Sequence, residues 1–127
     1  AREIERYHAK IDAGAEYAIT QPIFDPEALF RFLDDANKHV RPIPVLAGVW
    51  PLTSYKNAEF MRNEVPGVTV PDWVMERMSR TQTKEDGRRM GIEIAQEICD
   101  AIVGRVNGFQ VSAPFGNVDI ALEVLRK

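Results

Sequence analysis

Hydrophobic residues recur along this chain with two alternating periods, and the alternation predicts a mixed α/β fold. Apolar residues within 4–11 fall at helical spacing, and Gly14 is the kind of residue that ends a helix. The run YAIT at 17–20 favours a short strand. The Asp-Pro pair at 25–26 then supplies an N-cap and a proline for the first turn of a second helix. The chain therefore begins with a helix, a strand and a helix.

Two further runs in the chain have the character of buried strands. Residues 43–49, IPVLAGV, are apolar almost throughout, as parallel strands covered on both faces are. Residues 108–113, GFQVSA, form a third predicted strand. Between and around these strands, helical spacing predicts an apolar stripe over 29–40, short helices opening at Ser54 and Pro71, a long helix over 83–104 and a closing helix over 118–125. Gly87 and Gly91 should weaken the long helix locally.

Strands that alternate with helices imply parallel pairing through right-handed crossovers. Two architectures remain, a small open doubly wound sheet or a piece of a closed (β/α)8 barrel. Three strands are few for an open sheet, whereas a complete barrel takes about 250 residues. The 127 residues show no repeat or linker, so we expect one segment, 1–127, with the length of half a barrel.

Composition narrows the classes of function. With 45% hydrophobic and 28% charged residues, the chain is typical of one globular domain. A net charge of -3 argues against a nucleic-acid partner, since phosphate recognition needs concentrated basic residues. The single cysteine, Cys99, excludes an internal disulfide and favours a reducing compartment. We find no leader and no apolar run of about 20 residues, so we expect a cytoplasmic protein without a membrane partner.

The ends of the three predicted strands carry the candidate site, because ligands gather at the carboxyl ends of parallel strands. Gln21 follows the first strand, and its amide can donate and accept while Pro22 holds the turn, which suits a heterocyclic ligand. Equally, Gln21 could only cap backbone groups of the turn. Trp50 follows the second strand, as a stacking wall for a flat ligand or as a plug of the rim.

The chain shows no catalytic or metal-binding constellation. His8 lies on an apolar helical face and is better explained as a packed core residue than as a ligand. The acidic pairs at 34–35 and 85–86 have no partner histidine and are typical of solvated helix surface. Glycine-rich nucleotide-binding patterns are absent.

Several segments together identify a family. The segments KIDAGAEYAITQPIFD, IPVLAGVWPL, NAEFMRNEVPGVTVP, GIEIAQEI and GFQVSAPFG resemble the C-terminal half of methylenetetrahydrofolate reductases, and the resemblance spans essentially the whole chain. The motifs QPIFDP, AGVWPL and VSAPFG look most like those of the reductase domain of bacterial bifunctional proteins that also carry a homocysteine S-methyltransferase domain.

The resemblance implies an α/β fold, the C-terminal half of a (β/α)8 TIM barrel, and a flavoenzyme of one-carbon metabolism. Such enzymes hold FAD at the carboxyl ends of their strands and pass hydride from NAD(P)H to 5,10-methylenetetrahydrofolate, which becomes 5-methyltetrahydrofolate. Gln21 matches the family glutamine that contacts folate beside the flavin, and Lys10 matches a lysine that reaches the FAD phosphates. A surface lysine at that position could also simply remain hydrated.

The chain departs from the family pattern at three places around this site. Asn57 and Met61 stand where the family commonly has Gln and Phe against folate and nicotinamide, with Trp50 nearby as a third expected substrate contact. At the end of the third strand, Ser112 and the residues through 116 replace a Tyr-Thr-Leu-Asn-Arg motif, so a phenol near the flavin is lost. Ser112 is the expected cofactor contact there.

The residues that assist the chemistry belong, by the same resemblance, to the N-terminal half of such enzymes. We therefore expect a fragment that is inactive alone, with that half as a partner. Exposed strand edges would favour a homodimer of the fragment. The alternative hypothesis is an autonomous α/β ligand-binding or interaction domain without redox activity.

Overall fold

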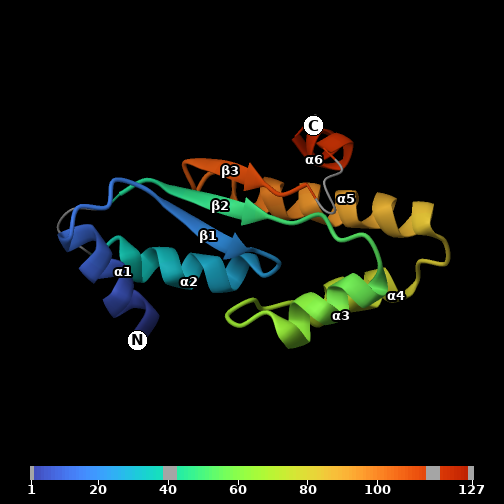
Figure 1. Cartoon of the computed structure of the whole chain (residues 1–127), viewed down its shortest axis with the longest axis horizontal. Coiled ribbons are helices and arrows are strands. Elements are labelled where there is room, and N and C mark those ends of the chain that lie inside the picture. The colour runs from blue at the N-terminus through green and yellow to red at the C-terminus, as the bar shows by residue number, and fades with distance from the viewer. Residues whose placement is uncertain (1, 39–42, 114–117, 126–127) are drawn as a thin grey trace.

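The computed structural model describes residues 2–38, 43–113 and 118–125. In these residues six helices and three strands follow one another in the order that the sequence predicts (Figure 1). The elements are α1 (Arg2–Asp12), β1 (Ala18–Pro22), α2 (Pro26–Ala36), β2 (Val45–Val49), α3 (Tyr55–Glu64), α4 (Asp72–Ser79), α5 (Lys84–Ile102), β3 (Gly108–Val111) and α6 (Val118–Leu125).

The three strands form one parallel sheet in the order β1-β2-β3. All three arrows in Figure 1 point the same way, so the carboxyl ends meet at one edge of the sheet, as predicted. We call this edge the rim. Parallel strands joined by helices in sequence order are the arrangement of part of a (β/α)8 barrel.

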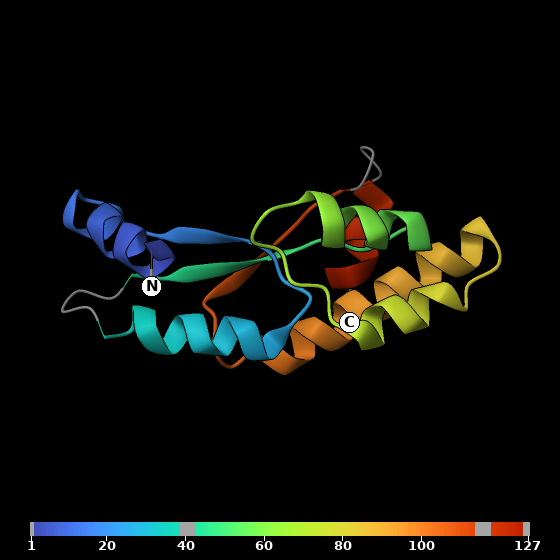
Figure 2. The same ribbon diagram turned by 90° about the horizontal axis from the view of Figure 1, so that it is seen from below.

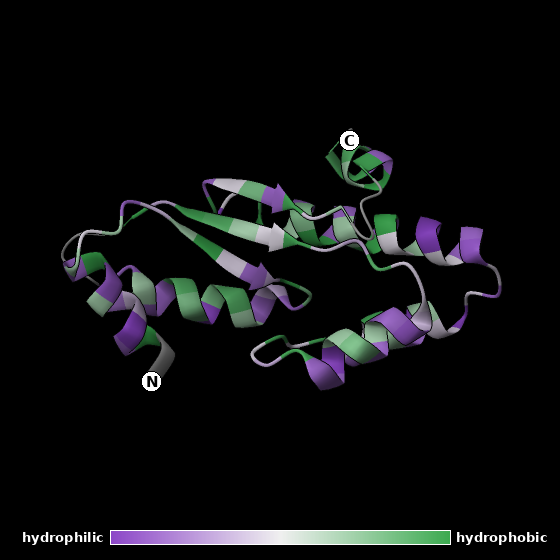
Figure 3. Cartoon of the chain, in the orientation of Figure 1, coloured by the Kyte–Doolittle hydropathy of each residue, from purple (hydrophilic) through white to green (hydrophobic). Residues whose placement is uncertain are grey.

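One face of the sheet is covered by α2 and α5, and the core lies there. Val45 and Ala47 of β2 belong to the same buried cluster as Leu33 of α2 and Ile98 of α5. Hydrophobic residues occupy most of β2, whereas the helices alternate between hydrophobic and hydrophilic sides (Figure 3). The near-continuous apolar sequence of β2 predicted a strand covered on both faces, whereas the described helices cover it on one face.

The opposite face of the sheet is open in the described residues. Ile19 of β1 is 50% exposed, and Gln110 of β3 is exposed as well. Leu46 pairs with Ile19 on one side and with Gly108 on the other, so these residues share the open face. In a closed barrel this face would point inward.

The first strand is longer than the sequence predicts, since it continues past Thr20 to Pro22. An irregularity in the ladder makes this possible: the Thr20 hydroxyl accepts from the Gly48 N–H at 2.9 Å and donates to the Gln21 carbonyl at 2.8 Å. Ile23 resumes the ladder by donating to the Gly48 carbonyl. A Cβ atom on Gly48 would lie 2.6 Å from the Thr20 carbonyl oxygen, so the irregularity requires glycine there.

In the long helix α5, Gly87 and Gly91 have a packing role beyond the local weakening that the sequence predicts. A Cβ atom on Gly91 would overlap the Leu52 carbonyl oxygen, and one on Gly87 would overlap that of Thr53. These glycines let α5 lie directly against the segment that follows β2. Thr83 caps the helix by accepting from the Asp86 N–H at 3.1 Å.

The remaining differences from the predictions concern boundaries. β2 begins at Val45 rather than 43, β3 ends at Val111 rather than 113, and α5 ends at Ile102 rather than 104. The helix that carries the apolar stripe predicted over 29–40 ends at Ala36, with Asn37 as its C-cap, and the last two positions of the stripe lie outside the described residues. Asp25 and Ser54 cap α2 and α3 through their side chains, as expected. None of the helices in the described part of the chain is long and apolar enough to cross a membrane.

Candidate functional site

A groove with a volume of about 940 Å³ opens at the rim, beside the end of β2. We call it the rim groove. Its walls come from the residue after β2, from α3 and from the first turns of α5. The side chains that matter below are those of Trp50, Asn57, Phe60, Met61, Lys84 and Arg88.

Asn57 ties the segment after β2 to the first turn of α3. Its Oδ1 accepts from the Trp50 Nε1–H and from the Thr53 N–H, both at 3.2 Å, while its own N–H donates to the Ser54 hydroxyl at 3.1 Å. Because both donors use Oδ1, the two N–H bonds of Nδ2 have no partner among the described residues. Asn57 therefore offers donors, and no spare carbonyl, to a ligand in the groove.

The apolar part of the groove is built from an exposed ring and a buried thioether. Phe60 is 55% exposed, whereas Met61 is only 4% exposed and belongs to the core. Trp50 is half-buried and packs against the same core cluster. Thus Trp50 and Phe60 present ring surface to a ligand, and Met61 forms part of the floor.

The predicted residues of β1 lie at the next strand end. Pro22 lines the groove, and Gln21 beside it has an exposed side chain. No hydrogen bond joins the Gln21 amide to any other described residue, which counts against the alternative that Gln21 only caps its turn. Its amide is left for solvent or a ligand.

Ser112 lies at the end of the third strand, next to the end of β2. Its N–H donates to the Val49 carbonyl at 2.9 Å, and its side chain is half-buried. The structure thus brings Ser112 to the same rim as Gln21 and Trp50. The other residues of the replaced motif, 114–116, lie outside the described residues.

Lys10 is the one predicted site residue that the structure does not bring to the rim. It is exposed in the last turn of α1, and α1 ends near the amino ends of the strands, at the opposite edge of the sheet (Figures 1 and 2). His8 lies on the same helix, half-buried beside Tyr7 with a ring separation of 6.1 Å. His8 is therefore placed as a packing residue and not as a ligand of the rim groove.

Among the described residues, the pKa of Tyr7 departs clearly from its ordinary value. Its ring meets Phe32 edge-on at 5.2 Å, which joins α1 to α2. Burial raises the pKa of the Tyr7 phenol above its ordinary value. Because Tyr7 is far from the rim along the sheet, this shift concerns stability and not the site.

Lys84, Arg88 and Phe60 were not predicted as site residues. The spacing of Lys84 and Arg88, one helical turn apart, was visible in the sequence. What the sequence could not show is that side chains from α3 and from the first turns of α5 line one groove with Trp50. No group of three or more potential metal ligands occurs among the described residues.

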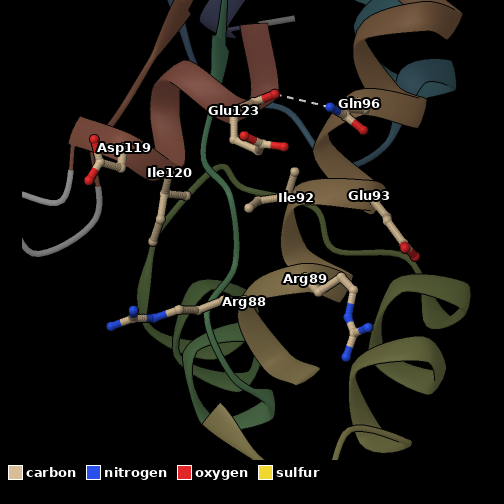
Figure 4. Close-up of a pocket in the computed structure, with 8 residues that line it drawn as sticks. All are labelled: Arg88, Arg89, Ile92, Glu93, Gln96, Asp119, Ile120 and Glu123. Atoms are coloured by element: carbon tan, nitrogen blue, oxygen red, sulfur yellow. Dashed lines mark hydrogen bonds between the residues drawn. The ribbon is translucent and has the colours of Figure 1, made fainter. Parts of the chain in front are cut away.

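A second hollow, of about 620 Å³, lies between α5 and α6 (Figure 4). Gln96 donates to the Glu123 backbone carbonyl across it at 3.1 Å. Arg88 and Arg89 leave α5 in different directions, and Arg88 passes below Ile120 (Figure 4). The lining of this second hollow contains both basic and acidic side chains, so it does not indicate the charge of a ligand.

Comparisons with known proteins agree with this geometry. The sequence model of the family described as "Methylenetetrahydrofolate reductase" matches residues 1–113. Methylenetetrahydrofolate reductase 2 of Schizosaccharomyces pombe is 30% identical over 117 residues, which are 85% of this chain and 18% of that protein. The 5,10-methylenetetrahydrofolate reductase of Escherichia coli is 29% identical over 90 residues, which are 70% of this chain and 30% of that protein.

A solved structure shares the fold. It is described as an uncharacterized protein from Clostridium thermocellum that binds two copies of 5-methyl-5,6,7,8-tetrahydrofolic acid. The TM-score is 0.60 at 22% identity, and the match covers 96% of this chain and 46% of that chain. The chain therefore spans less than a third of these two curated relatives and less than half of this structural neighbour.

Proposed function

Because the chain belongs to the methylenetetrahydrofolate reductase family, we propose that it supplies the folate-binding side of an enzyme that reduces 5,10-methylenetetrahydrofolate to 5-methyltetrahydrofolate. The observation that carries the proposal is the rim groove, where Trp50 and Asn57 are held by one hydrogen-bond network. Family membership and the folate named for the structural neighbour support the same ligand class.

The groove suits the flat, polar ring of a reduced folate. Trp50 and Phe60 offer ring surface on which a pterin or aminobenzoyl ring can stack, and the Nδ2 of Asn57 can donate to a ring carbonyl. Gln21, at the next strand end, can both donate and accept. These residues would together hold and orient the ring in the groove.

The residues at the rim also fit the ring system of FAD better than they fit its phosphates. Gln21 and Ser112 place an amide and a hydroxyl at strand ends on either side of β2, where they can hydrogen-bond a flavin edge. Lys10, proposed for the phosphates, lies at the other edge of the sheet, so only a long, extended cofactor would reach it. When bound, FAD would accept hydride from NAD(P)H and deliver it to the folate.

The chain alone should lack reductase activity, because both curated relatives are more than twice its length. We propose that an N-terminal half barrel completes the site and covers the open face around Ile19. That the chain comes from a bifunctional protein with a homocysteine S-methyltransferase domain stays a prediction from the sequence motifs. The coding frame upstream of Ala1 tests both points, since it should continue into an α/β pattern.

Binding of 5-methyltetrahydrofolate to the purified chain tests the proposal. The chain has two tryptophans, and only Trp50 lines the groove, whereas Trp73 is 39% exposed on α4 beside Arg77. We expect ligand to quench the fluorescence of a Trp73→Phe variant, which reports Trp50 alone. A Trp50→Phe variant, which reports Trp73, should show little change. If ligand caused no saturable quenching in the Trp73→Phe variant, the proposed folate site would be contradicted.

The alternative, a ligand-binding domain without redox activity, would give the same quenching. The structural neighbour, described as binding 5-methyl-5,6,7,8-tetrahydrofolic acid, is compatible with either function. The two are separated by adding the N-terminal half of a reductase from this family and following NAD(P)H oxidation with a folate acceptor. Flavin binding and turnover favour the enzyme, and a colourless, inert mixture favours the binding domain.

The open face and the two outer strands also lead us to propose that the isolated chain pairs with itself. β1 and β3 each have a free edge among the described residues, and unpaired edges promote association. Light scattering should return a dimer or a larger species. A well-folded monomer near 14.4 kDa would refute this proposal.

A further inference from the structure

We propose that Thr20 is a positioning residue of the rim, because its hydroxyl holds the end of β1 in the conformation that presents Gln21 to a ligand. This inference rests on the proposed folate-binding function. Gln21 remains the residue that would contact the ligand, and Thr20 acts through it.

The pairing of β1 with β2 contains one extra residue just before the rim. Thr20 and Gln21 of β1 both stand opposite the single residue Ala47 of β2, and we call this feature the β1 bulge. The pairs that flank it are Ile19 with Leu46 and Pro22 with Gly48. A β-bulge bends its strand and changes the direction of the side chains in it, and bulges of this kind are common beside binding sites.

The β1 bulge decides on which face of the sheet the end of β1 lies. Side chains alternate between the two faces, and paired residues of neighbouring strands share a face. In an unbroken register Gln21 would pair with Gly48, and Pro22 would pair with Val49, which is 2% exposed in the core. The bulge instead pairs Pro22 with Gly48, and Pro22 lines the rim groove. Gln21 is thereby left out of the pairing with β2, and its side chain is exposed.

The Thr20 hydroxyl takes the place of ladder bonds that the bulge interrupts. Its Oγ1 accepts from the Gly48 N–H at 2.9 Å and donates to the Gln21 carbonyl at 2.8 Å. One hydroxyl therefore joins the two strands and also fixes the peptide group that follows the Gln21 Cα atom. A valine side chain has nearly the same shape and can make neither bond.

Among the described residues, little else determines the direction of Gln21. β1 is an outer strand of the described sheet, so β2 is the one strand that guides its backbone. The Gln21 amide has no hydrogen bond to another described residue. Gly48 makes room for the bulge, since a Cβ atom there would lie 2.6 Å from the Thr20 carbonyl oxygen and 3.1 Å from that of Gln21. Gly48 thus admits the bulge, and the Thr20 hydroxyl holds it.

The expected effect on affinity is that of one neutral hydrogen bond, because a misdirected Gln21 would lose its own bond to the ligand. Such a bond changes affinity by roughly threefold to tenfold. Removing the Thr20 hydroxyl also leaves the Gly48 N–H without its acceptor, so stability falls as well. A purely structural residue would lower stability without acting through Gln21, and a double-mutant cycle separates the two roles.

The first measurement is the affinity for 5-methyltetrahydrofolate, by fluorescence titration of the Trp73→Phe chain. Thr20→Val should weaken binding about fivefold, whereas Thr20→Ser, which keeps a hydroxyl, should stay within about twofold of the parent. Thr81→Val is the matched control. Thr81 is also half-buried and donates to a backbone carbonyl, that of Met78 at 2.7 Å, but it does not line the groove. This control should lower the melting temperature and leave the affinity unchanged.

The second measurement is a double-mutant cycle with Gln21→Ala. Gln21→Ala alone should weaken binding about fivefold, and adding Thr20→Val should weaken it no further, because Thr20 acts through Gln21. Losses that multiply to about 25-fold would overturn the inference and leave Thr20 a structural role only. Unchanged affinity in the single Thr20→Val variant would overturn it too.

A third measurement needs no ligand and so separates the inference from the proposed function. The amide hydrogen exchange of Gly48 is compared with that of Val45, whose N–H donates to the Asn107 side chain at 3.0 Å near the other end of β2. A general loss of stability speeds both amides, whereas loss of the Thr20 hydroxyl speeds Gly48 alone. The ratio of the two rates should rise about tenfold in Thr20→Val and stay near the parent value in Thr20→Ser.

The outcomes of this exchange experiment are distinct from those of the titrations. An unchanged ratio in Thr20→Val would overturn the inference even if the chain bound folate. A raised ratio in a chain that bound no folate would remove the folate-binding proposal alone, since Thr20 would still hold the strand end that bears Gln21.

Discussion

The segment from Trp50 to Asn57 has two contrasting sides. On one side, α5 approaches so closely that Gly87 and Gly91 leave no room for a Cβ atom against its carbonyl groups. On the other side, the same segment borders the rim groove, where the Nδ2 of Asn57 and the neighbouring cations have no partner among the described residues. Tight packing on one side thus holds a segment whose polar groups on the other side remain available.

This contrast shows how a small α/β unit can fix the backbone of a binding site. Loops with few contacts move, and a site built on them loses the precision that binding needs. Here the backbone after β2 is fixed by contact with α5 and by the Asn57 network. The four predictions below test the two sides separately, from the largest effect to the smallest.

Gly91→Ala should have the largest effect. In an exposed helix this change stabilises by about 1 kcal/mol, but here the new methyl group would overlap the Leu52 carbonyl oxygen. We expect the free energy of unfolding to fall by about 3 kcal/mol or more, measured by denaturant titration. Gly104→Ala is the control, because its Cβ atom would meet nothing within 4 Å. If Gly91→Ala stabilised the chain, the close approach of α5 would be wrong.

Gly48→Ala should come second and should act on the rim itself. Its methyl group would lie 2.6 Å from the Thr20 carbonyl oxygen, so β1 must shift where it bears Gln21. We expect a loss of about 1–3 kcal/mol in thermal or denaturant unfolding, together with weaker folate binding. Unchanged stability would mean that the irregularity in β1 relaxes freely.

Asn57 separates the fixed side of the segment from the ligand side. Asn57→Ala removes the acceptor for Trp50 and Thr53 and should cost about 1–2 kcal/mol of stability. Asn57→Asp keeps an acceptor oxygen but loses the Nδ2 donors, so stability should change by less than about 1 kcal/mol while folate affinity falls about tenfold. Chemical denaturation and the fluorescence titration measure the two effects. Equal losses of stability in both variants would contradict this division of roles.

Tyr7→Phe, far from both sides, should have the smallest effect. The pKa of the Tyr7 phenol is raised by burial, so its contribution to stability is complete below the ordinary tyrosine pKa and is lost as pH rises through the raised value. The variant should lie within about 0.5 kcal/mol of the parent at pH 7 and lose less stability between pH 9 and 11. Tyr17→Phe is the control, since Tyr17 is 61% exposed. Parallel alkaline curves for the Tyr7→Phe variant and the parent would show that burial of the phenol is unimportant.

Much of the site could be predicted because it follows from where strands end. Gln21, Trp50 and Ser112 were assigned to one rim from strand order alone, and the parallel sheet confirms that they share it. Their roles toward FAD and folate stay predictions. Asn57 and Met61 came from the family resemblance, and the structure places both in the groove. It adds that Asn57 also fixes the segment after β2, which a residue-by-residue resemblance does not reveal.

The sequence by itself determined the order and type of the helices and strands, because hydrophobic period, caps and breakers act over a few residues. It could not determine contacts between residues distant along the chain. The meaning of Gly48 and Gly91 depends on backbone from other elements, and glycine in a strand or helix otherwise indicates only local weakness. Only the tertiary structure brought Lys56, Lys84 and Arg88 together and left Lys10 at the opposite edge, because charge placement depends on where helices begin in space.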